Sequence, residues 1–410
     1  MKRFDNTDNI LCFILELLKK KENTKMLEAS KKYIPQGYYP NIIPLILNLS
    51  KQKNIEGDTL TDPFAGGEPP RTSNKIIGVR KIESWENFFL NAAIDAVRIT
   101  LGEPDEYNFS FFSAITGDMF AYLYGKGKPC DSGITNYFFV PQVVKKAFEV
   151  MGYECTYISQ KQIRTEFHKV MAMIKDSIDK GIPVISWGMG NVTLADGAHY
   201  DPLPEGCYIG GYDVNDILYV NLYLDGLTVD DNDYCTISNG LTTAKGLFVI
   251  GKKIKSLEIA EVYQNVMNMI PVYLTLESTD GYSFGKEAFY QWADTLLDDT
   301  IFSNKSEEEL ANIRWDYHCT AYCMTCTSLG RGIEFFKKAI EIVPEFELAK
   351  NILPQYEKLL EFNQQIWDKQ GGFEPPLDKL ATHEYRSDLA DILREMGDIC
   401  DEIVAVYVDN

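Results

Sequence analysis

The stretch PEGCYIGGYDVNDILYVNLYL, residues 204–224, decides the fold class of the chain. Apolar and aromatic residues flank a polar turn at residues 213–216, the pattern of two antiparallel strands joined by a tight turn. We therefore predict a β-hairpin here. Strand patterns also occur at residues 153–159, 182–188 and 246–254, and the first two each follow an amphipathic helix pattern that ends in a glycine. Helix and strand patterns therefore both occur in this part of the chain.

The remaining patterns divide the chain into four segments. A helix is expected over residues 84–102, where apolar residues recur with helical spacing and Gly102 is a suitable C-cap. After the last strand, helical patterns occupy residues 256–274, 283–297, 308–329, 332–343 and 386–407. We predict an N-terminal helical leader (1–55), a linker loop (56–75), an α+β domain (76–255) and a C-terminal helical domain (256–410).

The composition indicates a globular protein and limits the kinds of partner it can bind. The chain has 410 residues, of which 45% are hydrophobic and 12% aromatic, enough for two or three cores. Its formal charge of −20 repels phosphate backbones and anionic membrane surfaces. We therefore expect neither nucleic acid nor membrane as a partner, and we interpret the acidic excess as a solubilising surface.

The N-terminus and the cysteines indicate a cytoplasmic protein. The first apolar run, in MKRFDNTDNILCFILELLKKK, is interrupted by Asp5, Asp8 and Glu16, and no cleavage site of small residues follows it. It predicts an amphipathic helix and not a signal peptide. No stretch approaches the roughly 20 apolar residues that cross a bilayer. The nine cysteines are scattered and odd in number, which is not typical of a secreted disulfide framework.

The segment HCTAYCMTC carries Cys319, Cys323 and Cys326 with the spacing that binds the cluster of a radical-SAM enzyme. Such a cluster loop follows an early strand of an α/β barrel, whereas this triplet lies in a predicted helix within a helical bundle. On a helix the three residues share one stripe, as small core residues do. We expect core packing; a metal site and a redox role are the alternatives. No metal and no cofactor are predicted.

Other motifs are weak. GKGKP at 125–129 and GMGN at 188–191 lack the spacing and the flanking residues of a phosphate loop, so their glycines are interpreted as turn residues. Of the four histidines only His199 is near the hairpin, in a loop-like segment. A solvent-facing side chain is its simplest interpretation.

The order of elements resembles a known family. A helix that begins near residue 88, a helical insertion, and strands containing GYD and ILYVN are similar to the papain-like, bacteriocin-peptidase type fold, in particular to the group of butirosin biosynthesis protein H. SAITGDMF resembles the Gly-containing turn after the first helix of that group. GCYIGGYD resembles the strand that precedes the hairpin turn in that group. SFGKEAFYQWADTLL and SLGRGIEFFKKA resemble its helical half. The resemblance covers residues 76–410.

The resemblance implies a catalytic cysteine at the start of the central helix, a histidine on the first hairpin strand and an Asp or Asn on the second. The positions that correspond to these roles are Phe89, Glu205 and Asn221. Only Asn221 keeps a suitable side chain. For Cys207 we expect core packing. The alternative is that it faces the same cleft as Glu205, since residues two apart on a strand point the same way, and pairs with His199.

Three functions compete. The first is a non-catalytic papain-like module, a pseudoenzyme, that binds a small molecule, peptide or carrier-protein partner in the former active-site cleft. Its ligand-binding residues would be Trp85, Phe88, Phe89, Glu205, Cys207, Tyr212 and Asn221. The second is an acyltransferase or amide hydrolase of the same group that uses Cys207 or Glu205. The third is a regulator or scaffold whose N-terminal helices dock another protein.

Overall fold

A computed structural model gives the conformation of most of the chain after the leader. It describes residues 55–69, 71–82, 90–131, 133–137, 141–189, 192–193, 199–200, 203–220, 230–236, 241, 244–276, 278 and 281–409. The leader predicted over residues 1–55 therefore lies outside the described residues, except for Ile55. None of the described helices is both long and apolar enough to cross a bilayer.

The described residues form two compact units. The α+β unit comprises Gln52–Phe112 and Pro141–Leu257, and the helical unit comprises Ser113–Val140 and Glu258–Asn410. The second stretch of the helical unit begins at Glu258. The segment 113–140 differs, because the sequence pattern assigns it to the α+β domain. Its strand β2 (Leu123–Gly125) pairs with β11 (Tyr282–Phe284), which is why this segment belongs to the helical unit.

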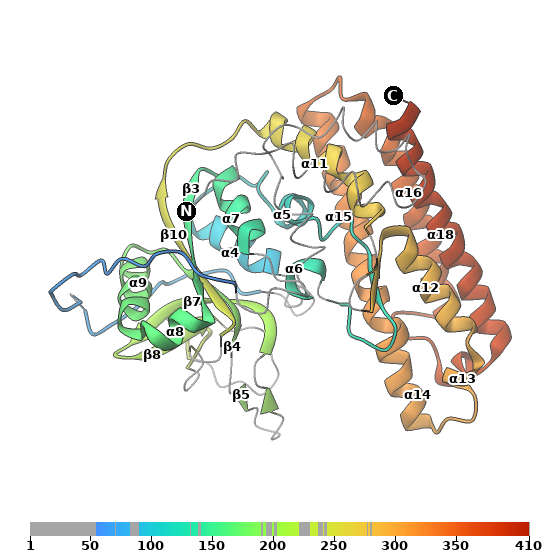
Figure 1. Cartoon of the computed structure of the whole chain (residues 1–410), viewed down its shortest axis with the longest axis horizontal. Helices are drawn as coiled ribbons and strands as arrows, with labels where there is room; N and C mark the ends of the chain where they lie inside the picture. Colours follow the sequence, from blue (N-terminus) through green and yellow to red (C-terminus); the bar gives the residue numbers. More distant parts are fainter. Residues whose placement is uncertain are drawn as a thin grey trace. The chain divides into compact units, whose positions relative to one another are not determined.

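The α+β unit is built on an antiparallel sheet (Figure 1). The strand order is β3 (Tyr153–Ser159), β10 (Gly246–Lys253), β4 (Val184–Met189), β7 (Leu203–Asp213), β8 (Asp216–Val220) and β9 (Tyr234–Thr236). β1 (Ser73–Lys75), inside the predicted linker, adds to the end of β7. β5 (Val192–Thr193) and β6 (His199–Tyr200) form a separate pair. β7 and β8 confirm the predicted hairpin, with its turn at Val214 and Asn215.

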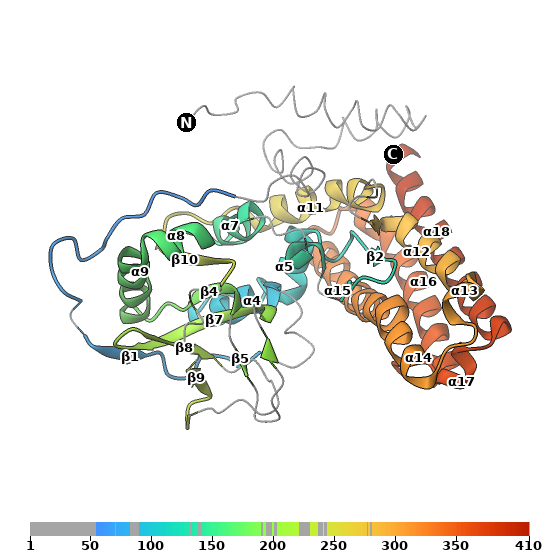
Figure 2. The same cartoon turned by 60° about the horizontal axis from the view of Figure 1, so that its bottom comes forward.

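Five helices accompany this sheet: α4 (Leu90–Thr100), α7 (Pro141–Val150), α8 (Gln160–Thr165), α9 (Phe167–Asp179) and the first half of α5 (Phe109–Thr116). Helix α4 lies along β7 and β4 (Figure 2), α7 contacts β3, and α9 contacts β1 and β7. Gly102, with φ of 70°, follows α4, and Gly181, with φ of 78°, follows α9. Glycine adopts these left-handed conformations without the steric cost of a side chain, which ends each helix where the sequence predicts.

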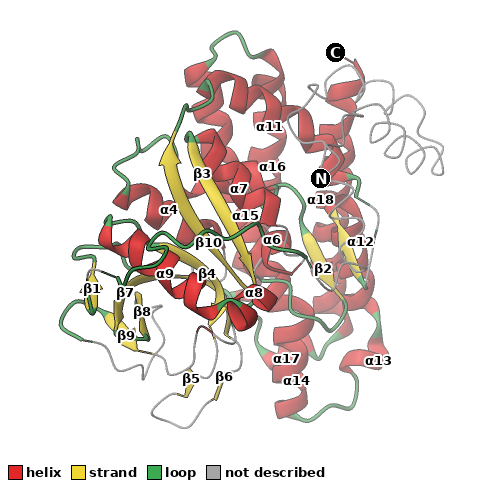
Figure 3. Cartoon of the chain, turned by 60° about the vertical axis from the view of Figure 1, so that its left-hand side comes forward, coloured by secondary structure: helices red, strands yellow, loops and turns green. Residues whose placement is uncertain are grey.

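The helical unit contains long helices (red in Figure 3) around an aromatic core. Its elements are the second half of α5, β2, α6 (Gly133–Tyr137), α11 (Ile259–Leu274), β11, α12 (Gly285–Leu297), α13 (Asp299–Phe302), α14 (Glu307–Arg314), the π-helical turn η2 (Trp315–Cys319), α15 (Thr320–Ile342), α16 (Glu347–Gln370), α17 (Leu377–Leu380) and α18 (His383–Asp409). α12 packs along α18, and α16 contacts both α15 and α18. Phe120 lies within 6.4 Å of Tyr273, Phe335, Phe336 and Tyr356, measured between ring centroids.

Two helix predictions in this unit need correction. The sequence pattern separates helices at residues 330–331, but α15 continues through Gly330 and Gly332 to Ile342. A Cβ atom on Gly332 would lie 3.1 Å from the Tyr356 ring, so this glycine permits close approach of α15 and α16 instead of ending a helix. The sequence pattern does not predict α16, whose interior holds Pro354. Proline usually marks a helix end, and here tertiary packing overrides that signal.

Gly285 allows the chain to pass close to the end of α11. Its φ is 54°, and an added Cβ atom would lie 2.1 Å from the Leu274 carbonyl oxygen. We expect Gly285→Ala to lower the free energy of unfolding by about 2–4 kcal/mol, from backbone strain and overpacking. Gly330→Ala is the matched control, because an added Cβ atom there meets no atom within 4 Å. It should raise stability by about 0.5–1 kcal/mol through helix propensity. Urea unfolding compares the two, and equal effects would contradict this explanation.

Candidate functional site

The expected cleft is described only in part. Trp85, Phe88, Phe89 and Asn221 lie outside the described residues. Glu205 lies in β7 and His199 in β6, but only their backbone is described. The convergence of Phe89, Glu205 and Asn221 on one cleft therefore remains a prediction.

Cys207 is buried inside the sheet. It pairs with Ser186 across β7 and β4, and its thiol donates a hydrogen bond to the Ser186 carbonyl oxygen at 3.4 Å. The Ser186 hydroxyl donates to the Gly188 carbonyl oxygen at 2.8 Å. Neither Cys207 nor Ser186 has exposed surface. Tyr219 is also fully buried. Its burial is the main reason that the pKa of its hydroxyl is raised, and the nearby Cys207 raises this pKa further. A thiol in this position packs and does not reach an external substrate.

Tyr212 joins the sheet to a helix. Its hydroxyl donates to Asp179 Oδ1 at 2.9 Å, and the same oxygen accepts a hydrogen bond from the Asn74 side-chain amide at 2.8 Å. The Lys175 ammonium group lies 5.2 Å from the Tyr212 ring centroid. The pKa of Tyr212 is raised to about 12, mainly by burial and in addition by its hydrogen bond to the Asp179 carboxylate. Tyr212 therefore fixes β7 to α9 and β1 and offers no surface to a ligand.

The central helix contains a charged pair that the sequence analysis did not single out. All residues of α4 from Leu90 to Arg98 are buried, including Asn91, Asp95 and Arg98. Most surface helices expose one face, so burial on every face forces the polar side chains into the interior. The signal in the sequence is an Asp and an Arg three positions apart within an otherwise apolar helix.

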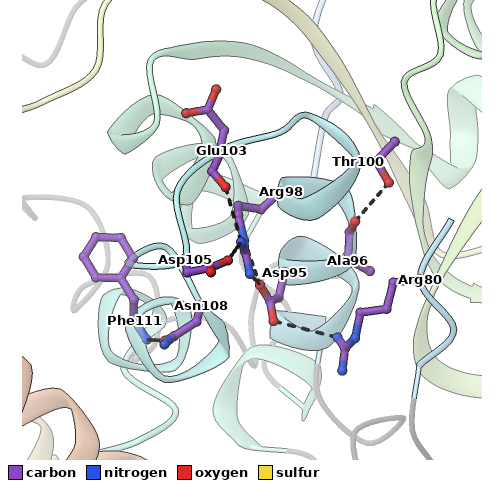
Figure 4. Close-up of polar contacts among 9 residues, drawn as sticks. All are labelled: Arg80, Asp95, Ala96, Arg98, Thr100, Glu103, Asp105, Asn108 and Phe111. Atoms are coloured by element: carbon purple, nitrogen blue, oxygen red, sulfur yellow. Dashed lines mark hydrogen bonds and ion pairs between the residues drawn. The ribbon is translucent and has the colours of Figure 1, made fainter. Parts of the chain in front are cut away.

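Arg98 is the centre of a polar network (Figure 4). Its Nε and Nη2 atoms both donate to Asp95 Oδ1, at 3.0 and 2.7 Å. Its Nη1 atom donates to the Glu103 carbonyl oxygen at 3.3 Å and to Asp105 Oδ1 at 2.9 Å. Arg80 Nη1 lies 3.8 Å from Asp95 Oδ2. The guanidinium group thereby ties the loop after α4 to the helix interior.

Glu103 extends this attachment to the sheet. Its carboxylate accepts hydrogen bonds from Lys253 Nζ at 2.5 Å and from the Tyr153 hydroxyl at 2.7 Å. Burial by itself would raise the pKa of Glu103, but the hydrogen bonds from Lys253 and Tyr153 outweigh it and lower the pKa. The loop after α4 is thus held to α4 by Arg98 and to strands β10 and β3 by Glu103.

The cysteine stripe of the helical unit is only partly buried. Cys319 is fully buried, whereas Cys323 and Cys326 are half-buried. Burial is the main reason that the pKa of Cys323 rises to about 12; Asp131 and the neighbouring thiols, Cys130 among them, raise it further. These thiols are protonated near neutral pH, whereas metals bind the thiolate. Within the part of the chain that the structure describes, no group of three or more His, Cys, Asp or Glu side chains could hold a metal ion.

His318 is a buried histidine in a defined tautomer. The Trp292 indole N–H donates to His318 Nδ1 at 3.2 Å, so the proton is on Nε2, which donates to Gln370 Oε1 at 2.9 Å. His318 has no exposed surface, and burial lowers its pKa to about 4. The residue lies in the π-helical turn η2, a feature that is frequent at functional sites and has no sequence signal here.

Comparisons with known proteins do not assign the chain to a family. A search against models of protein families found no match, and neither did a search of curated protein sequences. The papain-like resemblance therefore rests on the motifs quoted above.

We expect Arg98→Met to lower the free energy of unfolding by about 3 kcal/mol, because it leaves Asp95 buried without its main partner. Combining it with Asp95→Leu should recover most of this loss, since an apolar pair of similar volume avoids the buried charge. Denaturant unfolding of both variants measures the difference. A double variant no more stable than Arg98→Met would mean that packing of the guanidinium, and not charge pairing, matters.

The neutral His318 predicts a pH dependence of stability. Between the ordinary pKa of 6.5 and the folded value of about 4, the unfolded chain binds a proton at this position and the folded chain does not. Stability should therefore fall as the pH drops through this window, by about 2 kcal/mol between about pH 7 and about pH 5. His318→Gln can supply the same acceptor and donor without titrating. If the variant loses as much stability as the wild-type protein, His318 is not responsible.

Proposed function

We propose that the α+β unit is a non-catalytic papain-like module, which binds a small molecule, peptide or carrier-protein partner between the start of the central helix and the β7–β8 hairpin. The observation that carries this proposal is the complete burial of Cys207. Cys207 is the hairpin residue best suited to replace the missing nucleophile, and its thiol is committed to the Ser186 carbonyl group. Phe89, at the position of the family's cysteine, cannot attack a substrate.

The arrangement of the central helix also supports the proposal. Helix α4 runs along β7 and β4, and under this proposal it corresponds to the helix that carries the catalytic cysteine in the family. Leu90 and Asn91 are fully buried, and the preceding Trp85, Phe88 and Phe89 are aromatic. Aromatic and apolar side chains with a few polar groups are the usual lining of a ligand pocket.

The alternative is an acyltransferase or amide hydrolase that uses Cys207 or Glu205. Through Cys207 this function would require β4 and β7 to separate, because the two strands pair at Ser186 and Cys207. Separating them would expose backbone groups in the middle of the sheet, at a cost for each unpaired group. The non-catalytic function needs no such opening.

The two functions predict different behaviour of the thiol. In the folded protein, we expect Cys207 to react with iodoacetamide at least about a hundredfold more slowly than after unfolding in urea, because reaction requires local opening. Mass spectrometry of peptides identifies the labelled cysteine. Hydrolysis of a nitrophenyl ester should be unchanged in Cys207→Ser. Rapid labelling of Cys207 in the folded protein, together with loss of ester hydrolysis in Cys207→Ser, would establish the enzyme in place of the binding module.

The proposed cleft can be tested with anilinonaphthalene sulfonate, a dye that fluoresces in apolar pockets. We expect the folded wild-type protein to bind it, and Phe89→Ser to weaken binding by a factor of about 10, the usual effect of one aromatic pocket residue. Ile99→Ser is the matched control, because Ile99 is exposed and lies at the other end of α4. Equal dye binding by the two variants and the wild-type protein would refute a cleft at Phe89.

A further inference from the structure

The helical unit exposes large apolar side chains on η2 and α16. Among its described residues, the exposed large hydrophobic side chains are Trp315, Leu360 and Trp367, with exposed fractions of 42%, 37% and 42%. Trp315 begins the π-helical turn η2, and the other two lie seven residues apart on α16. That spacing is two helical turns, about 10 Å, and puts both on one side of the helix.

Ring contacts connect the two tryptophans into one surface. The Trp315 ring lies 6.5 Å from Phe373, Phe373 lies 5.9 Å from Tyr322, and Tyr322 lies 6.5 Å from Trp367, measured between centroids. Figure 3 shows α14 and α17 side by side at this end of the unit, and the two helices are in contact. We call Trp315, Leu360, Trp367 and Phe373 the aromatic surface.

The aromatic surface has a rigid base. Tyr322 is fully buried beneath it, and its hydroxyl donates to the Asn363 carbonyl oxygen at 3.2 Å. The Tyr322 ring stacks on His318 with centroids 6.0 Å apart, and His318 is fixed by Trp292 and Gln370. Exposed aromatic rings on a fixed base lose little entropy on binding, which is typical of interface hot spots.

Three carboxylates outside ion pairs flank this surface. Asp316, Glu361 and Asp368 each directly follow one of its apolar residues, which on a helix places them about 100° around the axis from it. Asp368 Oδ1 accepts a hydrogen bond from the neutral Gln364 side-chain amide at 2.9 Å. None of the three forms an ion pair with a described residue. The nearby cations are already engaged: Arg314 pairs with Glu374 at 2.5 Å, and Lys369 pairs with Asp388 at 2.7 Å. The border is therefore negative around an apolar centre.

We propose that the aromatic surface docks a basic amphipathic segment of another protein, with its apolar face on Trp315, Leu360 and Trp367 and its Lys or Arg side chains on the three carboxylates. Apolar anchors supply the affinity in such complexes, and opposite charges at the rim increase the rate and selectivity of association. A second copy of this chain fits the surface poorly, because it would bring the same unpaired carboxylates and a formal charge of −20.

The test uses a fluorescein-labelled helical peptide of about 18 residues, five turns, with leucine on one face and lysine on the other. A matched peptide carries glutamate in place of every lysine. By fluorescence anisotropy, we expect the lysine peptide to bind the full chain, and the glutamate peptide to bind at least about tenfold more weakly. The variant Trp315→Ser/Trp367→Ser should weaken binding of the lysine peptide by a factor of about 30 or more.

Two control variants separate the surface from the overall charge of the protein. Asp316→Lys/Asp368→Lys should weaken binding at low salt, whereas Glu384→Lys/Asp391→Lys, exposed carboxylates on α18, should change it less than about twofold. Equal binding by the wild-type protein and Trp315→Ser/Trp367→Ser, or no binding of the lysine peptide, would overturn the proposal. So would a dimer in sedimentation equilibrium that Trp315→Ser/Trp367→Ser converts to a monomer, since the occupant would then be a second copy.

Discussion

Burial of helix α4 from Leu90 to Arg98 is the constraint on which the α+β unit depends. A helical segment that contacts β4 and β7 and is buried on every face cannot send its charged residues to water. Asp95 and Arg98 must therefore satisfy each other, and the spare donor of Arg98 binds the loop at Glu103 and Asp105. The cost of burying the charges is offset only because nearly every donor and acceptor is used.

The helical unit meets a similar requirement around η2. Tyr322 and His318 are buried there, and each carries a polar group that is costly to leave without a hydrogen bond. Tyr322 finds a backbone carbonyl, and His318 stays neutral between Trp292 and Gln370. These buried polar contacts specify one packing of the helices around η2. They also hold the rings beneath the exposed Trp315 and Trp367 in place.

The two proposals concern separate parts of the chain and rest on different physics. For the α+β unit the proposal is binding without catalysis, because the residue that could replace the nucleophile, Cys207, packs inside the sheet. The aromatic surface is proposed from exposed apolar rings and from carboxylates that form no ion pair with a described residue. If both proposals hold, the protein binds a ligand through one unit and a protein partner through the other.

The sequence by itself determined that strands precede a helical C-terminal part, and it determined the β7–β8 hairpin, because hydrophobic periodicity and turn residues are local signals. Only the tertiary structure decided that the segment 113–140 belongs to the helical unit, that α15 runs through Gly330, and that α16 continues past Pro354. It also decided that Cys207 is buried and Trp315 exposed. Burial and strand pairing between distant segments depend on contacts far apart in the sequence, and no local pattern encodes them.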